Sequence, residues 1–201
     1  YAKRKTDELG IKNIEYMQVD ILQTKKLNRN FDIIEASGVL HHMKDPIYGW
    51  NVLLSSLTSG GLMKVGLYSK LARRHIAKTR SEIDLHKLKS NCPDEMRSFR
   101  KKLIKSEKPH HKALWSSRDM YSLSEFRDLL FHVQEHQFNI KDLIGALERL
   151  NLSFCGFENK IVVDRFVSEH NDLSEKFDLQ KWAKFEQKYP DSFSSMYQFW
   201  C

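Results

Sequence analysis

The sequence contains 201 residues, of which 41% are hydrophobic and 29% are charged. With a mean hydropathy of −0.55, this balance predicts a globular protein of one large domain or one domain plus a subdomain. It excludes a disordered tail and a fibrous repeat, and no apolar run approaches the roughly 18 residues that span a bilayer. Three cysteines, Cys92, Cys155 and Cys201, form no CxxC pair. They exclude a disulfide framework and a zinc ribbon, and they favour a cytoplasmic protein.

The net charge of +7 is concentrated in one segment. Residues 70–112 carry 14 Lys and Arg against 5 Asp and Glu, a local charge of +9. Such a segment suits an anionic partner or, more commonly, forms a solvated helical face. We expect no nucleic-acid partner, because no interleaved aromatic residues and no nucleic-acid motif accompany the charges.

The first residues, YAKRKTDELG, are typical of the second half of a helix that stops at Gly10. They do not form a signal peptide, since no apolar core follows the basic residues. Because the first residue is Tyr1, we expect the sequence to be a fragment whose upstream elements were removed.

Two short runs, 14–19 and 31–36, have the composition of strands. The second is almost wholly apolar, as a buried parallel strand is. Asp45-Pro46 then opens a helix that is expected to run through Leu57 and to stop at Ser59-Gly60-Gly61, which releases a third strand over 62–67. Strand, helix and strand in this order predict a right-handed crossover and a doubly wound α/β sheet.

The remaining pattern is mainly helical. We expect a basic helical region over 69–107 with a break near Cys92-Pro93, helices over 122–131, from Asn139 onward and over 179–189, a short strand over 153–157, and a packed aromatic run over 196–200. The pattern divides the chain into three parts: a Rossmann-like core at 1–69, a basic helical lid or substrate insertion at 70–135, and a return to the core sheet with carboxyl-terminal helices at 136–201.

Ligands of open α/β sheets bind beyond the carboxyl ends of the strands. Asp20-Ile21 follows the first run, where a carboxylate suits an adenine amino group and an apolar neighbour suits its ring. The second run leads into Glu35-Ala36-Ser37-Gly38-Val39-Leu40-His41-His42. Its small residues let the backbone approach a ligand, and its histidines stand at the mouth of the expected cleft.

At these residues the chain resembles class I S-adenosylmethionine-dependent methyltransferases, and specifically those fused behind tetratricopeptide repeats. The resemblance extends over nearly the whole chain and rests on FDIIEASGVLHHMKDP, LTSGGLMKVGLYS, RDLLFHVQEHQFNIKDL, LSFCGFE and MYQFW. The family introduces its fifth strand with a Pro-Gly-Gly turn. Here the turn is Thr58-Ser59-Gly60-Gly61, which lacks the proline but keeps the paired glycines.

The resemblance implies an S-adenosyl-L-methionine cofactor and a class I sheet that is incomplete at its amino end. The family's first strand, its Gly-rich loop and its ribose-binding acidic residue should lie upstream of Tyr1. It also implies these contacts: Asp20 and Ile21 with the adenine; Glu35, Ala36, Ser37 and Gly38 with the methionine portion; Leu40 and His41 facing the methyl group. The methyl acceptor, a protein or a small molecule, is not identified, and the upstream repeats would bind a protein partner.

Methyl transfer is an in-line displacement, so alignment and the exclusion of water are the main requirements. His41 and His42 are the expected catalytic bases for an oxygen or nitrogen nucleophile. The alternative for either histidine is a structural cap bonded to the backbone. Tyr68 and Trp115 either face the cationic sulfonium or pack in the core.

A second motif, His132-Val133-Gln134-Glu135-His136, matches the HxxEH pattern of inverted zinc metallopeptidases. On a helix its two histidines would share one face, so a zinc hydrolase is an alternative function. Within the methyltransferase interpretation, Arg127, Asp128, His132, Glu135 and His136 are expected to bind the acceptor substrate. They would otherwise form an Arg-carboxylate-His network that ties the lid to the core. We assign no metal ligands.

The remaining histidines, His110, His111, His75, His86 and His170, lack ligand-like partners in the sequence and are expected at the surface. Cys155 lies in an apolar run and is expected to be buried and inert. A non-catalytic interaction module that keeps the methyltransferase fold is the remaining alternative, because the basic region suits an acidic partner.

Overall fold

The computed structural model describes residues 1–170 and 172–201. The first part consists of α1 (Ala2–Glu8), the 3-10 helix η1 (Ile21–Leu27), β1 (Phe31–Ser37), η2 (Leu40–His42), α2 (Pro46–Leu54) and β2 (Leu57–Leu67). A helical region follows, with α3 (Arg74–Leu85), α4 (Pro93–Ile104), α5 (Pro109–Lys112), η3 (Ala113–Ser116), η4 (Arg118–Met120) and α6 (Leu123–Phe131). The last part holds α7 (Ile140–Leu150), β3 (Gly156–Phe157), α8 (Lys160–Ser168), η5 (Leu173–Phe177), α9 (Leu179–Lys188) and β4 (Tyr197–Trp200).

The described strands form one mixed sheet in the order β1-β2-β4-β3. The strands β1 and β2 are parallel, as the helix between them requires, and β4 is antiparallel to both of its neighbours. Two segments remote in sequence therefore meet in the sheet centre, β2 and the aromatic run at the carboxyl end. The mixed α/β class expected from the sequence is confirmed, and the aromatic run forms a strand as expected.

One expected strand does not form, and another begins earlier than expected. The run 14–19 is extended but joins no sheet, and its apolar side chains Ile14, Met17 and Val19 are exposed. The strand expected over 62–67 begins at Leu57, so the glycine turn lies inside β2 as a register irregularity opposite Phe31 and Ile33. Tertiary pairing with β1 overrides the local turn signal there, since the Phe31 amide donates to the Ser56 carbonyl at 2.9 Å.

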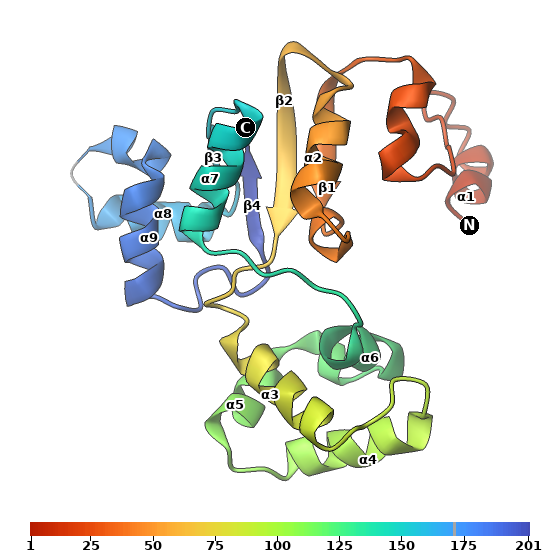
Figure 1. Ribbon diagram of the computed structural model, residues 1–201, viewed down its shortest axis with the longest axis vertical. Coiled ribbons are helices and arrows are strands. Elements are labelled where there is room, and N and C mark those ends of the chain that lie inside the picture. Colours follow the sequence, from red (N-terminus) through yellow and green to blue (C-terminus); the bar gives the residue numbers. More distant parts are fainter. Residues whose placement is uncertain (171) are drawn as a thin grey trace.

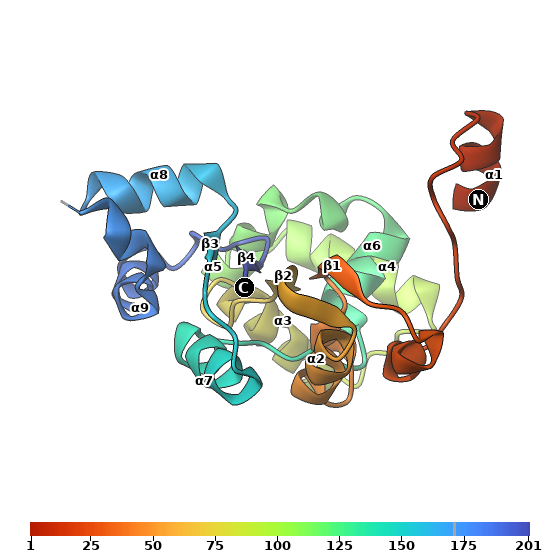
Figure 2. The same cartoon turned by 90° about the horizontal axis from the view of Figure 1, so that it is seen from above.

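The sheet is covered by helices on one face in the described residues. Figures 1 and 2 show α2 and α7 side by side against this face, while α1 stands apart from the rest. Met63, Val65 and Leu67 are buried beneath these helices, whereas Ile33 and Leu62 on the other face are 60% and 42% exposed. A doubly wound sheet has helices on both faces. The described residues supply helices to one face only, and the segment before β1 joins neither the sheet nor its second helical layer.

The helical region has a hydrophobic core of its own, separate from that of the sheet. Its helices begin and end near the expected positions, and the break near Cys92-Pro93 is confirmed because Pro93 is the first residue of α4. In Figure 1 the α3–α6 region lies beyond the end of β2, the end at which parallel strands present their ligand sites.

Local signals also set the helices of the last part. Asn139 and Asp142 form a reciprocal capping box at the start of α7, with bonds of 2.9 and 2.8 Å. The helix α9 covers the expected range up to Lys188. None of the helices formed by the described residues combines the length and the apolarity that crossing a membrane demands.

Candidate functional site

The carboxyl ends of β1 and β2 lie so close together that a side chain would not fit at Gly66. Ser37 pairs with Gly66, and the Gly38 amide points to the Gly66 carbonyl at 3.4 Å. A Cβ added at Gly66 would lie 2.9 Å from the Ser37 Cα and 2.7 Å from the Met196 Sδ. Gly38 has a φ of +75°, which disfavours any residue with a side chain. The two glycines therefore leave bare backbone at the end of the parallel pair.

His41 lies directly beyond this glycine pair, in η2, and is completely buried. Neither ring nitrogen has a hydrogen-bond partner within the described residues. The ring packs 4.0 Å from the Tyr68 ring, between centroids. Burial lowers its pKa to about 4, the nearby His42 adds to this effect, and the Gly66 carbonyl opposes it. His41 is therefore a neutral imidazole whose two ring nitrogens have no hydrogen-bond partner among the described residues, which calls for a ligand, a water molecule or an ion beside the ring.

His42 continues the series of rings toward the protein surface. Its Nδ1 lies 3.1 Å from the Gln134 carbonyl oxygen, and its ring centroid lies 4.1 Å from that of His132. The His136 amide donates to the His41 carbonyl at 2.8 Å. Segment 132–136 thus runs along η2 as an extended chain, and Tyr68, His41, His42 and His132 form a continuous row that we call the histidine row.

Segment 132–136 is not helical, so the alternative of a zinc-binding helix at this motif is wrong. The helix α6 ends at Phe131, and His132 has an extended ψ of 130°. Long-range contacts decide this conformation, because the backbone of the segment bonds to η2 and Glu135 is engaged elsewhere. The two histidines consequently do not share a helical face as the metallopeptidase pattern requires.

Glu135 is held by two arginines in a buried ion pair. Arg73 binds it in a bidentate manner with two bonds of 2.9 Å, and the Arg80 Nη2 lies 2.8 Å from its carboxylate. Burial raises the pKa of Glu135, but the two guanidinium groups outweigh this effect and lower it below its usual value. The Arg73 guanidinium also lies 3.7 Å above the Tyr68 ring. This network joins the helical region to the end of β2.

A cavity of about 690 Å³ opens beside the histidine row. Tyr68 and Arg73 line it from the end of β2, Leu114 and Asp119 from the helical region, and Met196 from the segment before β4. It therefore lies between the sheet and the helical region, at the strand ends where α/β proteins bind ligands.

The other residues expected to bind the cofactor lie in different elements and have different partners. Asp20 caps η1, where its carboxylate accepts from the Leu22 amide at 2.9 Å, and Ile21 is the first residue of that helix. Glu35 is exposed and lies 3.2 Å from the Lys64 ammonium.

Three more of these residues lie at the end of β1 or shortly after it. Ala36 and Leu40 are buried in the sheet core, while Ser37 is partly exposed. Backbone and small side chains, rather than charged groups, thus surround the end of β1.

The structure divides the residues expected to bind the acceptor. Arg127, Asp128 and His132 line one cavity of about 390 Å³. Glu135 is taken up by the arginines, and His136 lines a different cavity of about 410 Å³ beside α7. Sequence proximity therefore does not bring these five side chains into one site.

Several expected surface and core assignments are wrong. His110 and His111 are buried, at 5% and 4% exposure, and share Glu82 as a partner. Cys155 is exposed rather than buried. Trp115 is 40% exposed rather than in the core. Glu82 lies 28 residues from His110, so no local sequence signal indicates the pair.

A buried acid beside the cleft was also missed by the sequence analysis. Glu186 accepts hydrogen bonds from the Ser69 hydroxyl at 2.6 Å and from the Tyr197 hydroxyl at 2.6 Å. Burial raises its pKa. Its two polar partners come from the segment after β2 and from β4, so Glu186 ties α9 to the sheet.

No family model matches this chain. It is 26% identical over 204 residues to the uncharacterized protein syc1184_c of Synechococcus sp., covering 92% of this chain and 46% of that protein. Among solved structures it is similar to PKMT2 from Rickettsia typhi, with a TM-score of 0.65, 15% identity and coverage of 98% of this chain and 40% of the other.

A second structure of the Rickettsia typhi protein, in complex with AdoHcy, is similar to the same extent, with a TM-score of 0.65, 16% identity and the same coverage. These likenesses establish a shared fold. The chain spans less than half the length of each of these proteins.

Proposed function

We propose that this chain forms part of an S-adenosylmethionine-dependent methyltransferase, with its cleft at the carboxyl ends of β1 and β2. The single observation that carries the proposal is His41, a fully buried imidazole with two unpartnered nitrogens beside the bare backbone of Gly38 and Gly66. The likeness in fold to an AdoHcy-bound structure supports the choice of cofactor.

The residues fit the methionine end of such a cofactor better than its adenine end. A Cβ at Gly38 would meet only the Met196 Cε, at 3.9 Å, so this glycine leaves room for a close ligand, and the small Ser37 precedes it and pairs with Gly66 of β2. At the adenine end, Asp20 already accepts the Leu22 amide, which leaves its second carboxylate oxygen for an amino group. The cofactor supplies an electrophilic methyl group on a cationic sulfonium.

His41 suits this chemistry because it is neutral. A protonated imidazole beside a sulfonium would place two positive charges together in a buried space, at a large electrostatic cost. The lowered pKa of about 4 prevents this at neutral pH and leaves a nitrogen free to accept a hydrogen bond from the attacking group. His41 then orients the nucleophile by accepting this hydrogen bond, and the proton that the nucleophile loses passes to solvent in the adjoining cavity.

The cavity of about 690 Å³ is the acceptor site in this proposal. The helical region at 70–135 acts as its lid, and Arg127, Asp128 and His132 contribute an outer contact for the acceptor. The acceptor is a protein or a small molecule. We also propose that the complete protein contains the missing amino-terminal part of the sheet and tetratricopeptide repeats that bind a protein partner, and that it is cytoplasmic, in keeping with its three free cysteines.

Calorimetric titration of S-adenosylhomocysteine into the full-length protein tests the proposal. Gly38→Ala and Gly60→Ala form a matched pair, because φ is +75° and +76° at these two glycines. Both substitutions carry the same backbone strain, but only Gly38 lies at the cleft. We expect one-to-one binding to the wild type and to Gly60→Ala, and about tenfold weaker binding to Gly38→Ala, equivalent to about 1.4 kcal/mol.

Two outcomes would contradict the proposal. Equal affinities of the two glycine variants would show that the cofactor does not contact the end of β1. Absence of heat with the wild type at high ligand concentration would instead favour a non-catalytic interaction module that keeps the fold.

A further inference from the structure

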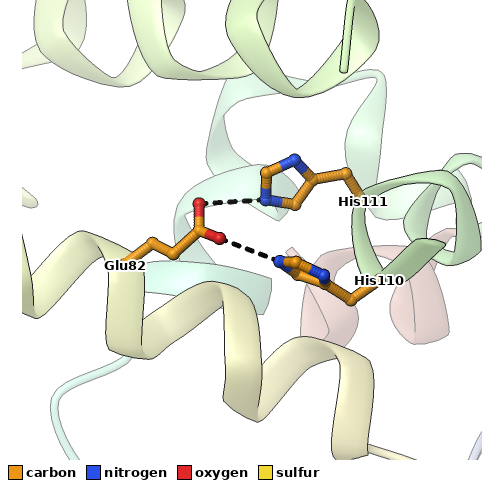
Figure 3. Close-up of side chains that lie close together, drawn as sticks. All are labelled: Glu82, His110 and His111. Atoms are coloured by element: carbon orange, nitrogen blue, oxygen red, sulfur yellow. Dashed lines mark hydrogen bonds and ion pairs between the residues drawn. The ribbon is translucent and has the colours of Figure 1, made fainter. Parts of the chain in front are cut away.

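A cluster of two histidines and one glutamate lies inside the helical region (Figure 3). The His110 Nε2 lies 2.9 Å from one oxygen of Glu82, and the His111 Nε2 lies 3.1 Å from the other. One ligand atom from each residue falls within 4.8 Å of the other two. Two ligands of a tetrahedral zinc ion lie about 3.3 Å apart when each is about 2.05 Å from the metal. The histidine–glutamate distances are those of hydrogen bonds, and a shift of a few tenths of an ångström would give them the spacing of zinc ligands.

The orientation of the rings is fixed by their surroundings. Figure 3 shows both imidazoles projecting from α5 toward the Glu82 side chain on α3. The His111 Nδ1 lies 2.7 Å from the Ser106 hydroxyl, which leaves Nε2 to face Glu82. Metal-binding histidines are commonly held in this way, with the second ring nitrogen bonded to a neighbouring polar group. His110 and His111 are 5% and 4% exposed, so burial also restricts their rotation.

The cluster retains an open side. A cavity of about 520 Å³ is lined by Glu82 and His111 together with His86 and Glu95. This space accommodates a water molecule as the fourth ligand, an arrangement seen in zinc sites that have three protein ligands. The Lys108 ammonium also lies 2.9 Å from Glu82, but its side chain is 57% exposed and free to turn to solvent.

We propose that Glu82, His110 and His111 bind a zinc ion that links α3 to α5. Imidazole nitrogens and a carboxylate suit zinc among the available divalent metals. Binding displaces the Lys108 ammonium from Glu82 and moves the ring proton of His111 from Nε2 to Nδ1, where it is donated to the Ser106 hydroxyl. The function of the link is to fix α5, a four-residue helix that is too short to be stable alone, against the longer α3. The site does not depend on the proposed methyl transfer.

Zinc binding to metal-free full-length protein, measured by competition with a chromophoric chelator, tests this proposal. We expect one equivalent of tightly bound zinc in the wild type. Removing a ligand in His110→Ala or His111→Ala should weaken binding by more than 100-fold, and Ser106→Ala by roughly 10- to 100-fold, as is typical when a group that orients a ligand is lost. The matched control is His75→Gln, which removes another imidazole from α3 outside the cluster. It should bind zinc as the wild type does.

A second measurement guards against variants that lose the fold. The thermal midpoint of the wild type and of His75→Gln should rise when zinc is added, whereas those of the two ligand variants should not, because binding to the native state alone is stabilising. The Co²⁺-substituted wild type should show the intense visible absorption of a four-coordinate site. Wild-type zinc affinity in either histidine variant, or no saturable binding by the wild type, would overturn the proposal.

Discussion

The sheet core and the helical region at 70–135 are stabilised by different interactions. Trp182, Tyr197 and Phe199 are completely buried in the sheet core, where aromatic rings pack on one another. The helical region also has a buried apolar core, but two ionic networks connect its helices, one at Glu135 and one at Glu82. Apolar packing is insensitive to pH, whereas buried charges depend on their partners. The stability of the helical region should therefore depend more on pH, and on a bound metal ion, than that of the sheet core.

The largest effect is expected from Trp182→Ala in the sheet core. The indole stacks 3.9 Å from the Phe166 ring and donates to the Lys176 carbonyl at 2.8 Å. Its removal leaves a cavity and should lower the free energy of unfolding by about 3–5 kcal/mol. Denaturant unfolding measures the change. Trp115→Ala, which removes a 40% exposed indole from the helical region, should cost no more than about 1 kcal/mol. A similar cost for both variants would remove the contrast between the regions.

The next largest effect is expected from Glu135→Gln, which leaves Arg73 and Arg80 buried without a carboxylate. It should cost about 3 kcal/mol, and hydrogen exchange should increase in α3 and α6 rather than in the sheet. The matched control is Asp164→Asn, which breaks the exposed Lys160–Asp164 pair and should cost less than about 0.5 kcal/mol.

The same variant should change the pH dependence of stability. Because the pKa of Glu135 is lowered in the folded state, its contribution is present above the ordinary value of 4.5 and is lost as pH falls through the folded value. The free energies of unfolding of Glu135→Gln and of the wild type should therefore become more similar as the pH falls below 4.5. If the stability difference between the two proteins stayed constant as the pH fell, the carboxylate charge of Glu135 would not be the source of the stabilisation.

A smaller, pH-limited effect is expected from His41, which lies where the two regions meet. Its pKa is about 4 in the folded state and 6.5 when unfolded. The unfolded chain binds more protons between these values, so stability falls as pH decreases from 6.5 to 4, by at most about 3 kcal/mol. His41→Phe keeps a ring in the stack and should flatten this part of the profile. The exposed His86→Gln is the control and should leave the profile unchanged; an unaltered profile in His41→Phe would contradict the assigned pKa.

Short-range signals predicted the elements whose residues interact with near neighbours. The capping box of Asn139 and Asp142 and the apolar stripe of α7 act within one helix, so this helix was predicted correctly. Asp45-Pro46 likewise set the start of α2. The end of α2 was predicted three residues too late, because pairing with β1 draws Leu57 into β2.

The contacts of the candidate site residues were not predicted, and the ligand cleft itself stays a prediction. The strand ends pointed to segment 35–42, and the structure places His41 there without polar partners. The roles of Glu135 and of His110 and His111 depended on partners far away in sequence, namely Arg73, Arg80 and Glu82. No periodicity or spacing reports such partners.

The sequence by itself determined the α/β class and most of the helix starts. These follow from backbone preferences and apolar patterns that act over a few residues. Only the tertiary structure decided that the HxxEH segment is extended, that the run 14–19 leaves the sheet and that a buried pair of histidines meets Glu82. The physical reason is that hydrogen bonds and ion pairs between distant segments outweigh local preferences of about 1 kcal/mol or less per residue.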